Sequence, residues 1–369
     1  MRIGIDGRFL NHPESGHGTY SRELISNLAE IDSENEYYVF VSPGYKPEIN
    51  QSNFHFIKTD IPYYSIAEQT KLPFILKKYQ LDLMHFVHFN KPILYRASNV
   101  ITIHDLTLTH FKGEKSNPIK QFFYKLIIGS AIKSSDSIIA ISEFTKQEIL
   151  KNYSVSEEKI SVIYEGFHPQ FRKIGNKSLI KETISGYNIT KPYIIYIGQQ
   201  RPHKNLVRLV NAFSQVRQKG LDYQLVLVGK KNPKYEQLNL EIKKQKLTQD
   251  VIFTGFAEDK ELPKLINGAR LLVMPSLMEG FGLPVLEGLA CDVPVAASRI
   301  SSLPEVGGQA VNYFDPYDSK DMAKIIYNTL TDKNLRTKLL DKSANQLKKF
   351  SWSNMADQVK QLYESFLPH

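Results

Sequence analysis

The sequence predicts an α/β protein of two domains, and three observations lead to this prediction. Short apolar runs alternate with amphipathic helical patterns along almost the whole chain, as in parallel sheets covered by helices on both faces. A chain of 369 residues is long enough for two domains that each bury a core. Between residues 165 and 192 the alternation stops and the sequence becomes polar, with scattered prolines and glycines, so we expect the domain boundary there.

The apolar runs predict a set of strands in each half of the chain. Those of the first half lie near residues 2–6, 37–41, 54–57, 83–87, 99–104, 137–141 and 160–163. Those of the second half lie near 193–197, 223–228, 250–253, 270–274, 293–297 and 310–313. The predicted helices lie near 18–30, 66–79, 118–134, 143–152, 203–219, 235–246, 259–268, 283–291, 319–331, 333–349 and 353–366.

Composition limits the class of protein. Apolar content of 42% and charged content of 23% are typical of soluble globular proteins. The single cysteine, Cys291, excludes an intramolecular disulfide and is expected to fill space in the core. No run approaches the roughly 20 apolar residues that span a bilayer, and the N-terminus leads directly into a strand without room for a signal peptide, so we expect a cytoplasmic protein.

The net charge of +9 suits anionic partners, which include lipid headgroups, nucleotide phosphates and nucleic acid. The basic residues do not form a single stripe interleaved with aromatic residues. We therefore do not expect nucleic-acid binding.

Residues 270–298 form the most informative stretch. A buried strand ends before Pro275, a turn with Gly280 and Gly282 follows, and Pro284 opens a helix that leads to the next parallel strand. Loops at this position are where open α/β sheets bind ligands. The glycines allow close backbone approach, and the free N–H groups at the helix start can hold phosphate oxygens.

Two carboxylates flank this predicted anion site, Glu279 before the glycines and Glu287 inside the helix. Acids beside a phosphate repel it, so we interpret them as acceptors of hydrogen bonds from hydroxyl groups. A ligand with hydroxyls on both sides of a phosphate is a nucleotide sugar. The alternative is a tight turn whose two glutamates are simply solvated.

The stretch from Glu279 to Glu287, with seven residues between the two glutamates, resembles the signature of the retaining family-4 glycosyltransferases, a mannosyltransferase-like group also described as "glycosyltransferase family 1" type. The resemblance implies that Glu279 contacts the transferred sugar and that Glu287 binds the nucleotide ribose. It also implies donor contacts from the residues between them, Gly280, Phe281, Gly282 and Leu283.

The resemblance extends over nearly the whole chain and implies the GT-B fold, in which two Rossmann-like β/α/β domains face each other across a deep cleft. Residues 1–170 would form the acceptor-binding domain and residues 171–352 the domain that binds the nucleotide sugar. A C-terminal helix over 353–369 would cross back to the first domain.

The loop after the first strand carries Gly16, His17 and Gly18. Its G-x-G, about ten residues beyond the strand, is a poor match to a dinucleotide-binding turn. In the family that it resembles, the equivalent loop touches the donor phosphate and the acceptor. This implies a donor-binding role for Gly16 and Gly18, and a lining role for His17.

His104 is expected at the carboxyl end of a buried strand, within Val100-Ile-Thr-Ile-His-Asp-Leu106. A histidine at a strand end is often only a satisfied core residue. The stretch resembles a family pattern in which this histidine contacts the donor sugar, so the resemblance places His104 among the catalytic residues.

Gly198 ends another strand, and Arg201 and Lys204 follow just before a helix. Two cations at a helix start can clamp a diphosphate and stabilise the charge that a leaving nucleotide gains. The pattern resembles the family's G-x-x-x-P-x-K-N, in which Lys204 matches, so both cations are predicted to be catalytic and donor-binding, and Gly198 is predicted to be donor-binding. It departs at Gln199, where some members have an arginine, and Arg201 is expected to substitute for that arginine.

Gly255 and Phe256 follow a further strand, and the resemblance implies that their loop holds the nucleotide base. Residues 115–134 combine lysines with aromatic and apolar residues. Apolar positions 119, 122, 123, 126, 127 and 131 form one helical stripe, which favours a helix packed on the sheet. A helix lying on a membrane surface is the alternative.

Together these features predict a retaining glycosyltransferase that moves a hexose from a nucleotide sugar, of GDP-mannose or UDP-sugar type, to a glycan or lipid-linked saccharide. A role in surface polysaccharide assembly and peripheral contact with the inner face of the cell membrane are implied by analogy. No metal or other cofactor is expected, since there is no D-x-D triplet and no His/Cys cluster with ligand spacing. The alternatives are a nucleotide-sugar epimerase of GT-B type and a non-catalytic protein that binds a sugar nucleotide.

Overall fold

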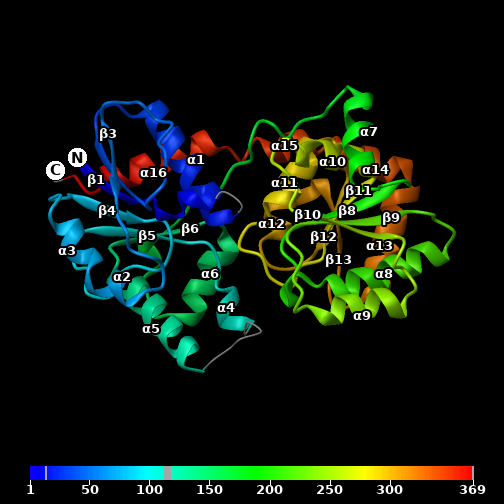
Figure 1. Cartoon of the computed structure of the whole chain (residues 1–369), viewed down its shortest axis with the longest axis horizontal. Coiled ribbons are helices and arrows are strands. Elements are labelled where there is room, and N and C mark those ends of the chain that lie inside the picture. Colours follow the sequence, from blue (N-terminus) through cyan, green and yellow to red (C-terminus); the bar gives the residue numbers. More distant parts are fainter. Residues whose placement is uncertain (13–14, 112–117, 368–369) are drawn as a thin grey trace. The chain divides into compact units, whose positions relative to one another are not determined.

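The computed structural model describes residues 1–12, 15–111 and 118–367 (Figure 1). The chain divides into two compact units. Unit 1 contains Met1–Gly166 together with Phe350–His369, and unit 2 is the continuous segment Phe167–Lys349. Both divisions of the chain lie a few residues before the expected ones at 170/171 and 352/353.

Each unit is built on one parallel sheet. The sheet of unit 1 has the strand order β3-β2-β1-β4-β5-β6-β7 and that of unit 2 the order β10-β9-β8-β11-β12-β13. The strands of unit 1 are β1 (Arg2–Asp6), β2 (Glu36–Val41), β3 (Phe54–Lys58), β4 (Leu83–Phe86), β5 (Asn99–Ile103), β6 (Ser137–Ala140) and β7 (Ile160–Val162). Those of unit 2 are β8 (Tyr193–Ile197), β9 (Gln224–Val228), β10 (Val251–Gly255), β11 (Leu271–Met274), β12 (Val295–Ser298) and β13 (Val311–Phe314).

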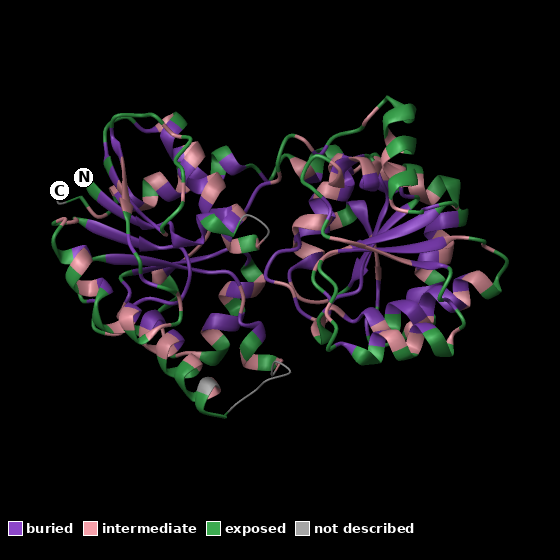
Figure 2. Ribbon diagram, in the orientation of Figure 1, coloured by how far each residue is buried: buried purple, intermediate pink, exposed green. Residues whose placement is uncertain are grey.

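Helices cover these sheets, and the strands between them are largely buried (Figure 2). The α-helices of unit 1 are α1 (Gly16–Ile31), α2 (Ile66–Thr70), α3 (Leu72–Lys77), α4 (Thr107–His110), α5 (Pro118–Ser134), α6 (Glu143–Asn152) and α16 (Trp352–Glu364). Those of unit 2 are α7 (Lys177–Gly186), α8 (Leu206–Gln218), α9 (Glu236–Lys244), α10 (Leu262–Gly268), α11 (Leu283–Ala290), α12 (Leu303–Gly307), α13 (Ser319–Thr331), α14 (Lys333–Leu340) and α15 (Ser343–Leu347). Short 3-10 turns occupy Arg8–Asn11, Glu157–Lys159, Pro202–Lys204 and Gly308–Ala310.

Every predicted strand is present, but several helix predictions were wrong. The helix predicted over 66–79 is two helices, because Pro73 in the first turn of α3 cannot donate the hydrogen bond that would continue α2. The helix predicted over 333–349 divides into α14 and α15. The segment 165–192 is not wholly irregular, since it contains α7 behind an Asn176 N-cap.

α16 completes unit 1 from the far end of the sequence. The Tyr363 hydroxyl forms a 2.5 Å hydrogen bond with Nδ1 of His85 on β4, and Lys360 lies 3.9 Å from a carboxylate oxygen of Asp32. Gly166 packs against the start of this helix so closely that a Cβ there would lie 2.2 Å from the Trp352 nitrogen. The two points where the chain passes between units are therefore neighbours within unit 1.

α5 corrects one prediction in part. Its C-terminal half packs on the unit through Ile128, Ala131 and Ile132, which are buried. In its N-terminal half the apolar positions expected to face the core are exposed, and they are Ile119, Phe122, Phe123 and Leu126. Helical periodicity identified the apolar stripe but could not show that its first half stays exposed among the described residues. Among the described helices, none is long and apolar enough to cross a bilayer.

Candidate active site

The strand order of unit 2 reverses between β8 and β11. From β8 the chain proceeds to β9 and β10 on one side, and it then returns to β11 on the other side. The loops after β8 and β11 are consequently neighbours at the carboxyl edge of the sheet, where ligands bind in open α/β folds. These loops carry the two strongest motifs of the sequence.

Hydrogen bonds fasten the loop after β8 to the loop after β11. The amide nitrogen of Asn205 donates to the Pro275 carbonyl at 3.0 Å, and the Leu277 backbone N–H donates to the His203 carbonyl at 2.7 Å. Asn205 has a left-handed conformation, with φ of 61°, which an asparagine tolerates better than most residues. The two motifs therefore form one rigid edge.

Lys204 and Glu279 meet at this edge. The ammonium nitrogen lies 2.7 Å from each carboxylate oxygen of Glu279, and the buried Ser276 hydroxyl donates to Oε1 at 2.6 Å. The two side chains are only 18% and 11% exposed, so each charge stabilises the other in a partly desolvated place. The sequence predicted that both residues contact a ligand, but it did not predict that they pair with each other.

The glycine turn contains one residue in the left-handed region of backbone conformation. Gly282 has φ of +107°, and a Cβ there would lie 2.7 Å from a Leu303 methyl group. Pro284 was predicted to be the first residue of the helix. α11 begins one residue earlier, at Leu283, so Pro284 is its second residue. The Ser302 hydroxyl holds the turn in place by donating a hydrogen bond to the Phe281 carbonyl at 2.7 Å. The Phe281 ring itself is buried.

Glu287 projects from α11 and has an unusual environment. Its Oε2 is buried and has no hydrogen-bond partner among the described residues. Burial, with a smaller contribution from the charge of Asp259, raises the pKa of Glu287 to about 8. A ligand hydroxyl would supply the missing partner, and the contact to a ribose stays a prediction.

The other predicted donor-binding residues of unit 2 lie at or just beyond the ends of β8 and β10. Arg201 is exposed and forms no ion pair with any described acid. Gly198 directly follows β8, Gly255 is the last residue of β10, and both have positive φ values. Phe256 follows directly, and its side chain is 61% exposed, so the ring is available for stacking on a base.

In unit 1 the strand order reverses between β1 and β4, and His104 lies at that edge, after β5. Its Nε2–H donates to the Val87 carbonyl at 2.9 Å. Nδ1 lies 3.4 Å from Oε1 of Glu165. Sequence reasoning missed Glu165 because it begins the polar segment, although its place just beyond β7 puts it at the same sheet edge as His104.

Further histidines surround His104. His17 packs edge-on against it, with ring centroids 4.6 Å apart, and against His88 at 4.5 Å. Burial, followed by the charge of His104, lowers the pKa of His17 to about 3. Burial also lowers the pKa of His88 well below its ordinary value. His17 and His88 are therefore neutral near pH 7 and line the site without carrying charge.

The two glycines beside His17 differ. A Cβ on Gly18 would lie 2.0 Å from the His12 carbonyl oxygen, so packing within the loop already requires a glycine there. Around Gly16 there is open space, with no described atom within 4 Å of such a Cβ. A contact with a ligand is therefore sterically easier to accommodate at Gly16.

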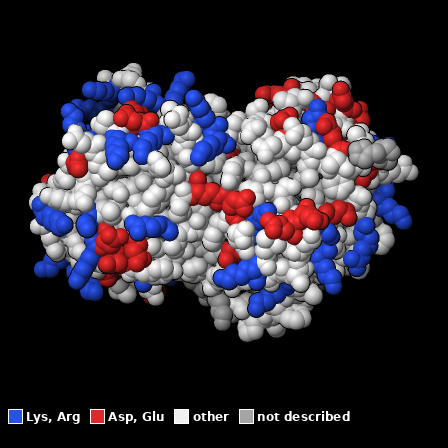
Figure 3. Space-filling model, turned by 180° about the vertical axis from the view of Figure 1, so that it is seen from behind, with Lys and Arg blue, Asp and Glu red and all other residues white. Residues whose placement is uncertain are grey.

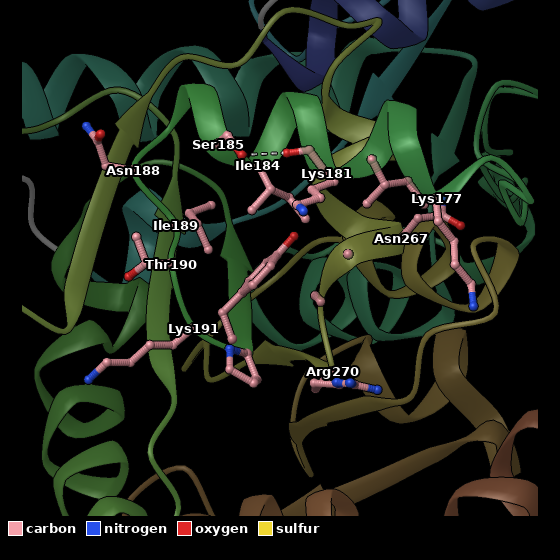
Figure 4. Close-up of a pocket in the computed structure, with 15 residues that line it drawn as sticks. Lys177, Lys181, Ile184, Ser185, Asn188, Ile189, Thr190, Lys191, Asn267 and Arg270 are labelled. Carbon is pink, nitrogen blue, oxygen red and sulfur yellow. Dashed lines mark hydrogen bonds between the residues drawn. The ribbon is translucent and has the colours of Figure 1, made fainter.

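Three further features bear on possible ligands. A cavity of about 670 Å³ lies beside α7, between Lys181 and Arg270 (Figure 4), and contains none of the predicted donor-binding residues. Within the described parts of the chain, no three His, Cys, Asp or Glu side chains converge as a metal site would require. On the face shown in Figure 3, basic and acidic side chains are interspersed and form no continuous basic stripe.

Replacing Glu287 with glutamine should change how stability depends on pH. The unfolded chain releases this proton near pH 4.5 and the folded protein near pH 8, so wild-type stability falls as the pH rises through that window. Glutamine cannot ionise. The melting temperature of Glu287→Gln relative to wild type should therefore increase between about pH 5 and about pH 8.5. Glu236→Gln, at an exposed position, is the control, and a pH-independent difference for Glu287→Gln would contradict the assigned environment.

Two family models match this chain, one in each half. A family model described as Glycosyltransferase Family 4 matches residues 15–171, and one described as Glycosyl transferases group 1 matches residues 180–346. The O-antigen chain mannosyltransferase B of Escherichia coli is 27% identical over 99% of this chain and 100% of its own length. The serotype-specific mannosyltransferase WbdA of Escherichia coli is 31% identical over 60% of this chain, which corresponds to 28% of that longer protein.

Solved structures establish the same fold. The sucrose-phosphate synthase of Thermosynechococcus elongatus aligns with a TM-score of 0.79 at 21% identity, over 99% of this chain and 98% of its own. Anabaena HepE, in complex with UDP and glucose, aligns with a TM-score of 0.77 at 18% identity, over 99% of both chains. Two family models that together cover most of the chain, and a relative aligned over its full length, show that this chain belongs to the group 1 and family 4 glycosyltransferases of GT-B fold.

Proposed function

We propose that this glycosyltransferase moves a hexose, with retention of anomeric configuration, from a nucleoside diphosphate sugar to a saccharide acceptor. The observation that carries the proposal is the Lys204–Glu279 pair at the switch point of the second sheet, beside the glycine turn and the start of α11. Lys204, Arg201 and the N–H groups of α11 provide positive charge for a diphosphate. Glu279 and Glu287 provide oxygens for hydroxyl groups on either side of it.

In the proposed mechanism, binding of the donor moves the Lys204 ammonium group from the Glu279 carboxylate to the diphosphate. The incoming diphosphate attracts the ammonium group, and the Glu279 carboxylate becomes available to hydroxyls of the sugar while Ser276 keeps it oriented. The acceptor oxygen bonds to the anomeric carbon on the face from which the phosphate oxygen departs. The leaving diphosphate takes the acceptor proton, and its growing negative charge is stabilised by Lys204 more strongly than in the bound donor.

On unit 1, His104 and the Gly16 loop are proposed to contact the sugar and the acceptor. The names of the relatives favour mannose as the sugar and O-antigen or another surface polysaccharide as the product. We propose a lipid-linked saccharide as the acceptor, which would require peripheral contact with a membrane.

Nucleotide binding tests the donor site directly. A ligand that binds only the folded state raises the melting temperature, so one nucleoside diphosphate among GDP, UDP and ADP should give a selective increase. Lys204→Ala should weaken that binding about tenfold or more, because a charge-assisted contact is lost. Lys338→Ala, at an exposed position of α14, should bind as wild type does. If no nucleotide raises the melting temperature, the proposed donor site is wrong.

Glu279→Gln tests the contact with the sugar. The substitution removes the charge but keeps the shape, so kcat should fall about 100-fold or more while the affinity for the nucleoside diphosphate changes little. Equal losses in both quantities would show that Glu279 acts through the nucleotide and not through the sugar. An epimerised sugar nucleotide, formed in place of a glycoside, would contradict glycosyl transfer.

The reaction is also proposed to be independent of metal ions, since Lys204 and Arg201 occupy the role that a divalent cation plays at a diphosphate. Initial rates with and without excess EDTA should then agree within error. A loss of activity that magnesium restores would overturn this part of the proposal.

A further inference from the structure

Unit 2 has a cavity at the sheet edge opposite the Lys204–Glu279 pair. The cavity, of about 670 Å³, lies where β8 begins at Tyr193 and where β11 begins after Arg270 (Figure 4). β8 has five residues, so the two edges of the sheet are about 16 Å apart. Small-molecule pockets have volumes of roughly 300–1,000 Å³. The cavity is therefore separate from the proposed donor site and large enough for a ligand of its own.

α7 forms one wall of this cavity and is held in place at its C-terminal half. A Cβ on Gly268, at the end of α10, would overlap a methyl group of Ile184 and would lie 2.5 Å from the Tyr193 hydroxyl. The Tyr187 hydroxyl, just beyond α7, donates to Oε2 of Glu261 at 2.6 Å. Because these contacts are close, the cavity is a fixed feature of unit 2 and not a gap beneath a detached helix.

The apolar side of α7 is incompletely covered where it faces the cavity. None of the residues of α7 is buried, although its sequence is amphipathic. Ile180 and Ile184 of this helix line the cavity together with the buried Ile189. A helix of ten residues depends on packing of its apolar side for stability. An apolar ligand group in the cavity would complete that packing.

The cavity is also basic. None of the described residues that line it is an acid, and four are cations, Lys177, Lys181, Lys191 and Arg270. Lys191 pairs with Asp222 at 2.8 Å and with Asp250 at 3.1 Å. The other three cations are exposed and form no ion pair with a described residue. In Figure 4, Lys177 and Lys181 extend from α7 toward the side on which Arg270 lies. Like charges gathered at one cavity repel one another, so an anion placed among them is stabilised.

We propose that this cavity binds an amphiphilic anion, in which one negatively charged group is joined to an apolar body. The charged group would lie among the three unpaired cations, and the apolar body would lie against the three isoleucines. The inference does not depend on the proposed function, because the cavity shares no residue with the proposed donor site.

Asn267 connects the cavity with the segment through which the chain enters unit 2. Asn267 lines the cavity, and its Oδ1 accepts from the Ile174 backbone N–H at 2.8 Å. Its side-chain amide also donates to the Arg172 carbonyl at 3.0 Å. A ligand in the cavity should therefore stabilise residues 172–174 as well as α7.

Hydrogen–deuterium exchange of the full-length protein with a defined probe tests the proposal and locates the binding. The probe is anilinonaphthalene sulfonate, an anion with apolar aromatic rings. It should slow exchange in α7 and in residues 172–174, and it should leave exchange in residues 199–205 unchanged. Titration of this protection gives the affinity of the cavity itself, whatever the probe binds elsewhere on the molecule.

Matched comparisons separate the charge from the apolar contact. Phenylnaphthylamine has the same rings without the sulfonate, and it should bind the cavity about tenfold or more weakly. Lys181→Ala/Arg270→Ala should weaken binding of the sulfonate by a similar factor. Lys333→Ala/Lys338→Ala removes two exposed charges from α14 and should bind as wild type does. Unchanged melting temperatures would show that both double variants are folded.

Three outcomes would overturn the proposal. Equal affinity of the cavity for the charged and the neutral probe, or for wild type and Lys181→Ala/Arg270→Ala, would show that the cations are only solvated. Displacement of the sulfonate by an equal concentration of inorganic phosphate would show that the apolar body contributes nothing. Protection that is absent from α7, or that is confined to residues 199–205, would show that the cavity does not bind this anion.

Discussion

The ion pair between Lys204 and Glu279 depends on β8 and β11 being neighbours in the second sheet. All strands of that sheet are parallel, so the loops after these two strands emerge at the same edge. Asn205 then fixes one loop on the other through the Pro275 carbonyl. That arrangement determines where the Glu279 carboxylate, the glycine turn and the start of α11 lie, because all three belong to the loop after β11.

Pairing also explains how an acid can lie at the proposed phosphate site. An unpaired carboxylate beside a diphosphate would repel it, and an unpaired lysine in the same place would lose hydration without compensation. In the structure the Lys204 ammonium group and the Glu279 carboxylate neutralise each other, and the Ser276 hydroxyl donates to one carboxylate oxygen. Glu287 differs, because its buried oxygen has no described partner and its raised pKa keeps it largely protonated near neutral pH.

Much of the fold could be predicted from the sequence because parallel strands are short, apolar and rich in β-branched residues. The motif residues could also be assigned to strand ends, since spacing along the chain determines which loop carries them. The Lys204–Glu279 contact could not be predicted, because the two residues are 75 positions apart and each was assigned to a ligand. Glu165 was missed because the polar composition of its segment concealed its position after β7. For α5, periodicity identified the apolar stripe, but whether a neighbour covers a helix is decided by tertiary packing.

The return of α16 to unit 1 has a consequence for the order in which the protein can fold during synthesis. Unit 2 is one continuous segment and is complete when Lys349 has been made. Unit 1 begins first, yet His85 and Asp32 receive their partners Tyr363 and Lys360 only from the last residues of the chain. Since domains generally fold as units as they leave the ribosome, the unit that starts first is the one that is finished last.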